Sequence, residues 1–161
     1  ARGEPNLSGV PPSGMNVLPP ALLRAYEETE YHVGGDTPLV LRIGQHSAAL
    51  KALHQRYAVA CSAVLTAANP HSQLHDPASN ALRQRGLAHD IAALGLPCVD
   101  ARGQHPANGW PAEASFWVPG IDIQMARQLG MRWEQNAFVF CGADAVARLV
   151  LPGCGKPGSK A

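Results

Sequence analysis

Apolar residues recur at helical spacing in four segments of the chain, and signals for helix ends accompany two of them. Asp76 followed by Pro77 is typical of a helix start, because the carboxylate accepts a hydrogen bond from a backbone N–H and proline fits the first turn. Gly95 ends the same segment, and Asp122 caps the last one. The pattern predicts helices over about 20–31, 47–57, 76–95 and 122–129.

Short apolar runs between these helices predict strands. Ala60 to Ala67 is almost continuously apolar, as expected of a central strand that is covered on both faces. Gly34-Gly35-Asp36 and Gly142-Ala143-Asp144 each separate two such runs and favour hairpin turns. The other predicted strands cover 31–33, 39–43, 96–101, 115–118, 137–141 and 146–151, with an irregular loop over 102–111.

The predicted order of elements is α-β-β-α-β-α-β-β-α-β-β, which mixes hairpins with crossover helices. We therefore expect an α+β or mixed α/β fold, with a single mixed β-sheet and about four helices packed on it. Residues 15–152 are expected to form this one domain. Residues 1–14 and 153–161 contain few apolar residues, so we expect a disordered leader and a flexible tail.

Composition excludes some classes of partner. The 13 Lys and Arg nearly balance the 12 Asp and Glu, so a nucleic-acid partner is not expected. The apolar runs are shorter than the roughly 20 residues that span a bilayer, and the first residues lack the pattern of a secretory signal. We expect a cytoplasmic protein in which Cys61, Cys98 and Cys141 are reduced and largely buried, and in which Cys154 is accessible. The oligomeric state stays open.

The most informative polar residues follow the predicted central strand. Open α/β sheets bind ligands beyond the carboxyl ends of their strands, and a helix N-terminus attracts anions. Asn80 and Arg83 share a face of the helix that follows. We predict that this crevice binds a small polar or anionic molecule through Thr66, Asn69, Ser72, Gln73, Asn80 and Arg83, with Gln135 and Asn136 contributing from another loop.

Three alternatives remain open for this region. The chain is an enzyme that acts on a nucleotide-like substrate, with Glu113 or His71 as general acid or base. It is a protein-interaction domain, which would show a large exposed apolar patch. In the third alternative nothing binds, Asn69 and Ser72 stabilise a turn, and Arg83 is a solvated helix residue.

Metal and cofactor sites are not predicted. His71 and His75 are the only weak candidates for metal ligands, because a zinc site needs three or four well-placed side chains. Gly153, Gly155 and Gly158 match the G-x-G-x-x-G pattern of dinucleotide sites. That site requires a helix after the glycines, which Pro157 opposes.

Several short blocks resemble a bacterial protein family of unknown function, domain of unknown function 3293. The blocks are Leu41 to Gln45, Thr66 to Gln73, Asn80 with Arg83, Glu113 to Ser115, and Leu129 to Ala137. The similarity runs from about Leu22 to Leu151. The family has an aromatic residue at the position of His71 and tryptophan at that of Ala68, so roles tied to those side chains do not carry over. The resemblance implies a cytoplasmic bacterial protein and no known activity.

Overall fold

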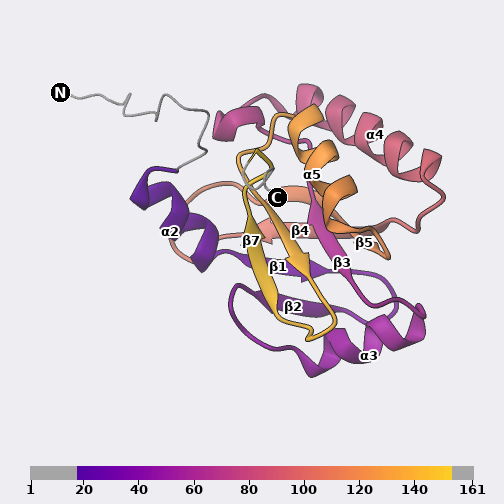
Figure 1. The fold of residues 1–161 in the computed structure, drawn as a ribbon. Coiled ribbons are helices and arrows are strands. Elements are labelled where there is room, and N and C mark those ends of the chain that lie inside the picture. Colours follow the sequence, from indigo (N-terminus) through magenta and orange to yellow (C-terminus); the bar gives the residue numbers. More distant parts are fainter. Residues whose placement is uncertain (1–17, 154–161) are drawn as a thin grey trace.

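The computed structural model describes residues 18–153, and its helices and strands follow one another in the predicted order (Figure 1). The predicted leader, and the predicted tail from residue 154 on, lie outside the described residues. The elements are α2 (Pro20–Glu28), β1 (Glu30–Val33), β2 (Leu39–Arg42), α3 (Ala48–Arg56), β3 (Ser62–Leu65), the short 3-10 helix η1 (Pro70–Ser72), α4 (Pro77–Ala93), β4 (Val99–Gln104), β5 (Glu113–Pro119), α5 (Ile123–Arg132), β6 (Phe138–Cys141) and β7 (Ala147–Val150).

The seven strands form one sheet in the order β2-β1-β4-β5-β3-β6-β7, which confirms an α+β fold. All six pairs of neighbouring strands are antiparallel, whereas a mixed sheet was expected. Helices α4 and α5 do connect strands that run in the same direction, as predicted. However, β5 lies between β3 and β4, and β3 lies between β5 and β6, so these strands do not pair with each other.

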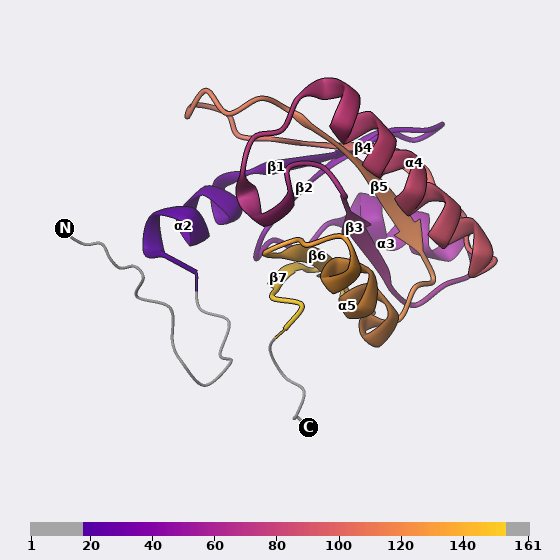
Figure 2. The ribbon, with the colours of Figure 1, turned by 90° about the horizontal axis from the view of Figure 1, so that it is seen from above.

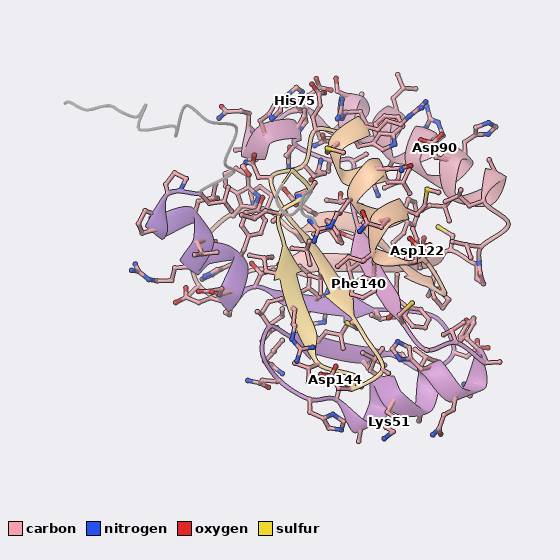
Figure 3. All side chains as sticks on the ribbon, viewed as in Figure 1. Lys51, His75, Asp90, Asp122, Phe140 and Asp144 are labelled. Atoms are coloured by element: carbon pink, nitrogen blue, oxygen red, sulfur yellow. The ribbon has the colours of Figure 1, made fainter. Side chains whose placement is uncertain are left out.

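The sheet curls until its two edge strands meet at one end. Ile43, just after β2, forms a parallel bridge with Ala147 of β7, and His46 bridges Val146. The backbone N–H of Gly44 donates to the carbonyl of Ala147 at 2.7 Å. Figure 1 shows β7 crossing in front of β1 and β2, and Figure 3 shows Asp144, in the turn between β6 and β7, on the side of the molecule where α3 lies. The contact closes this end of the curled sheet.

The two faces of the sheet are covered by different helices. Helices α4 and α5 pack on the outer face through a core that includes Leu65, Leu87 and Leu129. On the inner, concave face, a second core joins Val64 and Trp117 to side chains of α3. Figure 2 shows α2 and α3 at opposite ends of the molecule. Helix α3 therefore fills the inner face at one end, and α2 lies at the other.

Local capping explains why α4 and α5 begin where they do. The Asp76 carboxylate accepts a hydrogen bond from the backbone N–H of Ser79 at 2.9 Å. Asp122 does the same for Met125 at 2.8 Å. Both predicted caps are confirmed, because a helix N-terminus needs acceptors for its first N–H groups and the sequence supplies them locally.

The three cysteines in the described part of the chain form no disulfide. Cys141 is buried, as predicted, and burial raises the pKa of its thiol to about 12. Cys61 is half-buried. The prediction is wrong for Cys98, which is exposed because it precedes β4 instead of lying within it. Cys154 lies outside the described residues. None of the described helices combines the length and the hydropathy that a membrane crossing requires.

Candidate functional site

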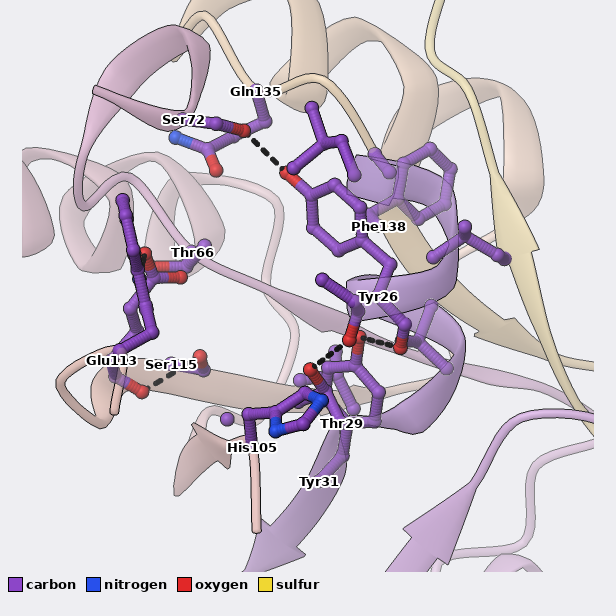
Figure 4. A pocket seen from close by; sticks show the side chains of 18 of the residues that line it. Tyr26, Thr29, Tyr31, Thr66, Ser72, His105, Glu113, Ser115, Gln135 and Phe138 are labelled. Atoms are coloured by element: carbon purple, nitrogen blue, oxygen red, sulfur yellow. Dashed lines mark hydrogen bonds between the residues drawn. The ribbon is translucent and has the colours of Figure 1, made fainter. Parts of the chain in front are cut away.

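A cavity of about 150 Å³ lies between α2 and the inner face of the curled sheet (Figure 4). Apolar cavities of about this volume accept benzene, so the space suits a ligand group the size of one ring. Every strand except β2 contributes to the lining. Figure 4 shows Thr66, Glu113, Ser115 and Gln135 on one side, and Tyr26, Thr29, Tyr31 and Phe138 on the other. The wall formed by α2 and β1 is aromatic, and the opposite wall is polar.

Glu113, the first residue of β5, is the acidic side chain of the polar wall. Its Oε2 accepts a hydrogen bond from Nδ2 of Asn69 at 2.8 Å and another from the indole Nε1 of Trp110 at 3.2 Å. No described residue donates to Oε1. The carboxylate is therefore held in position with one oxygen available to a ligand.

The turn from Asn69 to Ser72 follows β3 and has an uncommon backbone conformation. Asn69, His71 and Ser72 all have positive φ, at 48°, 55° and 59°. Such values are costly for residues other than glycine, and asparagine is among those that adopt them most readily. Asn69 is 5% exposed, and its Oδ1 accepts from the backbone N–H of His75 and from Nδ2 of Asn80, both at 2.9 Å. These hydrogen bonds hold the turn against its backbone strain.

Ser72 connects this turn to α2 and to the segment before β6. Its Oγ lies 2.8 Å from the hydroxyl of Tyr26 and accepts a hydrogen bond from Nδ2 of Asn136 at 2.8 Å. Gln135 donates to the carbonyls of Ala68 and Trp133, both at 3.0 Å. The hydrogen bond between Ser72 and Tyr26 therefore joins the turn after β3 to α2.

Burial raises the pKa of both tyrosines in the aromatic wall. It is the largest cause for Tyr26 and for Tyr31, and the negative charge of Glu113 raises both values further. The two hydroxyls are therefore neutral, and the Tyr31 hydroxyl donates to the carbonyl of Tyr26 at 3.2 Å.

His105 lines the cavity and contacts α2. Its Nδ1 accepts hydrogen bonds from the backbone N–H groups of Ala107 and Asn108, both at 3.0 Å. Because Nδ1 accepts these two hydrogen bonds, Nε2 is the ring nitrogen that faces Glu28. Nε2 then donates to Glu28 at 2.9 Å, which attaches α2 to the loop after β4.

The structure brings some of the predicted ligand residues to the cavity and leaves others outside. Thr66, Ser72, Gln135 and Glu113 line it. Asn69, Asn80 and Asn136 stand behind this lining and support it through the hydrogen bonds described above. Gln73 is exposed and does not line the cavity. The turn after β3 therefore contributes both a lining residue and a supporting network.

Arg83 is used within the protein and does not line the cavity. Its Nε donates to the carbonyl of Ala67 and its Nη2 to that of Trp133, both at 2.6 Å. Nη1 lies 3.3 Å from Oε1 of Glu134, and the guanidinium sits 5.4 Å from the centre of the Trp133 ring. The side chain is 22% exposed. All three guanidinium nitrogens are thus engaged, and they join α4 to the residues that follow β3 and α5. Arg83 is therefore neither the solvated helix residue nor the anion ligand that the sequence suggested.

The two histidines considered as weak metal candidates are both exposed. Nε2 of His71 lies 3.5 Å from Oε2 of Glu134, and neither residue lines the cavity. Within residues 18–153, no cluster of three or more His, Cys, Asp or Glu side chains is placed to hold a metal ion.

Sequence reasoning missed the aromatic wall. Tyr26 and Tyr31 fall within the first predicted helix, and neither was proposed for the site. Trp110, which lies beside Glu113 on the opposite wall, falls in the predicted loop over 102–111. The usable signal was the combination of Trp110 and Glu113 three positions apart at the start of a strand. A search for polar clusters passes over such a pair, because an aromatic side chain is usually part of a core.

The comparisons with known proteins give one match. Residues 65–138 match the profile of a family described as "Protein of unknown function (DUF3293)". No curated protein and no solved structure shows a significant match to the chain. The matched segment runs from the end of β3 to the start of β6, and it includes Thr66, Asn69, Glu113 and Gln135. The resemblance to this family is confirmed over residues 65–138, which carry the polar wall of the cavity, and the match does not extend over the whole stretch of about 22–151 that the sequence suggested.

Proposed function

We propose that this domain binds a small molecule in the cavity between α2 and the inner face of the sheet. The observation that carries the proposal is the convergence of polar side chains from four separate segments on one space, with the carboxylate of Glu113 fixed at its wall. Binding sites in proteins combine an apolar concavity with a few fixed polar groups, and this cavity has both.

The charge of the lining favours a polar ligand that donates hydrogen bonds. The cavity lining includes Glu113 and contains no lysine or arginine among the described residues. The expectation of an anionic ligand rested on Arg83, whose nitrogens are used elsewhere. An anion in the cavity would face the carboxylate of Glu113 without a compensating cation, which is unfavourable in a partly buried site.

A ligand screen tests this proposal, with a variant that fills the cavity as the decisive comparison. Gly103 lines the cavity, and a Cβ added there would meet Thr29 and Tyr31 at 3.7 Å, an ordinary contact. We expect Gly103→Val to keep the fold, because a β-branched residue suits a strand, and to abolish the binding of hits.

Gly142 provides the matched control. It lies between β6 and β7, away from the cavity lining, and a Cβ there would meet only the Asp144 carboxylate at 3.9 Å. Gly142→Val should bind every hit as the wild type does. Equal binding by wild type and Gly103→Val would contradict the proposal.

A second candidate is an enzyme in which Glu113 is the general acid or base. The observation in its favour is the fixed position of Glu113 at the cavity wall, since a catalytic group must lie within hydrogen-bond reach of the bound substrate. His71, the other candidate, does not line the cavity. If a bound ligand is turned over, Glu113→Gln should abolish turnover while ligand is still bound.

We also propose a cytoplasmic location for the protein. The free thiols of Cys61, Cys98 and Cys141 support it, because disulfides are rare in that compartment. Cell fractionation with a compartment marker tests the location, and recovery of the protein in a secreted or periplasmic fraction would contradict it.

A further inference from the structure

The cavity carries a net negative charge. Glu113 is the one carboxylate among its described lining residues, and the lining has no lysine or arginine. Both ring nitrogens of His105 are already engaged, because Nδ1 accepts two backbone hydrogen bonds and Nε2 lies 2.9 Å from Glu28. Glu28, which pairs with His105, is not itself a lining residue. A cation that enters the cavity therefore meets the carboxylate of Glu113 and no lysine or arginine among the described lining residues.

The walls around this charge are aromatic. Tyr26 and Tyr31 form one side, and Trp110 stands beside Glu113, to which its indole nitrogen donates. Aromatic rings attract cations through their electron-rich faces, and tryptophan and tyrosine do so more strongly than phenylalanine. Rings arranged around a small space, with a nearby carboxylate, are the usual means by which proteins recognise organic ammonium groups.

We propose that the ligand of this cavity is a small organic cation with an ammonium head group, which lies among Tyr26, Tyr31 and Trp110 and is neutralised by Glu113. This inference rests on the proposed binding function and specifies its ligand class. The volume of about 150 Å³ accommodates a head group of this kind and excludes a larger body, which would extend past Trp110, a side chain that is 36% exposed.

The experiment uses two probes of the same shape that differ in charge. Choline carries a trimethylammonium group, and 3,3-dimethyl-1-butanol replaces that group with a neutral tert-butyl group. Binding of each probe to the full chain is measured by titration at low salt. We expect choline to bind about tenfold more tightly, since a desolvated cation gains from the rings and from the carboxylate.

Variants then separate the contributions of charge and rings. Glu113→Gln should weaken choline binding about tenfold and leave the neutral probe within about twofold, because only the charged ligand uses the carboxylate. Trp110→Leu should weaken choline several-fold and the neutral probe less. Glu27, exposed on α2 and absent from the cavity lining, supplies the matched control Glu27→Gln, which removes the same charge and should bind choline as the wild type does.

The outcomes distinguish this inference from the proposed function. Equal binding of the two probes, or choline binding that Glu113→Gln leaves unchanged, overturns the inference. If other molecules bind and Gly103→Val abolishes their binding while choline does not bind, the inference fails and the proposed function stands. If no molecule binds in a Gly103-dependent way, both fail.

Discussion

The side-chain amide of Asn69 donates to the carboxylate of Glu113 at 2.8 Å, and this contact joins the turn after β3 to the first residue of β5. The same asparagine has φ of 48° and is 5% exposed. One buried residue thus holds a strained turn and positions the acidic group of the cavity. The wall of the candidate site and the local stability of the fold depend on the same side chain.

Replacing Asn69 should therefore reduce stability as well as binding. We expect Asn69→Ala to lower the free energy of unfolding by about 2–4 kcal/mol, because it leaves the backbone N–H of His75 and the amide of Asn80 without their acceptor. Asn69→Gly should cost about 1 kcal/mol less, since glycine adopts positive φ without strain. Urea denaturation measures both values. Equal losses for alanine and glycine would show that the turn is not strained.

Arg83 is expected to act as a structural residue. Arg83→Ala leaves the carbonyls of Ala67 and Trp133 without their charged donor, so the free energy of unfolding should fall by about 2–4 kcal/mol. Arg83→Lys should recover less than half of this loss, because an ammonium cannot reproduce the fork geometry of the guanidinium. Thermal melts of the two variants provide the test. A stable Arg83→Ala that has lost ligand binding would restore Arg83 as a binding residue.

Gly86 marks a close approach between α4 and the end of α5. A Cβ at this position would overlap the ring of Trp133, whose indole nitrogen donates to Asp90 at 2.9 Å. Gly86→Ala should destabilise the protein by about 1–3 kcal/mol, although alanine is the better helix former, because overlap in a packed contact outweighs that preference. In a double-mutant cycle with Trp133→Leu, the alanine should cost much less. Additive losses would mean that the ring is not the obstacle.

His54 should make stability depend on pH. It is 4% exposed, its Nε2 lies 2.8 Å from the hydroxyl of Ser62, and burial lowers its pKa from the ordinary value of 6.5. As pH falls below about 6.5, the unfolded chain binds a proton that the folded chain does not, so stability is lost toward the folded pKa.

We expect a loss of about 1 kcal/mol from this residue between about pH 7 and pH 5. Denaturation curves should show a smaller pH dependence for His54→Gln than for the wild type. His89, exposed on α4, gives the control His89→Gln, which should retain the wild-type slope. A slope that is unchanged in His54→Gln would show that the buried imidazole is not responsible.

The elements of the fold could be predicted because their signals are local. The caps at Asp76 and Asp122 and the glycine-containing turns act within a few residues, and the structure has the helices and strands in the predicted order. The pairing of strands could not be predicted in the same way. That β5 enters between β3 and β4, and that Ile43 reaches Ala147, depends on contacts between distant segments.

In the candidate site, too, the features set by local sequence could be predicted and those set by tertiary contacts could not. The loop after β3 was identified from its composition, and Thr66 and Ser72 do line the cavity. Arg83 was placed in the site because it shares a helix face with Asn80, but spacing does not reveal that the carbonyls of Ala67 and Trp133 take its hydrogen bonds. Where a long side chain ends depends on the tertiary structure.

The most direct test of the binding site is an amide NMR titration of the full chain with choline. We predict that shift changes concentrate in Tyr26, Thr66, Trp110, Glu113 and Gln135, on the inner side of the sheet, and that they are lost in Gly103→Val. Shift changes centred instead on α4 and α5, or the same changes in Gly103→Val as in the wild type, would contradict this prediction.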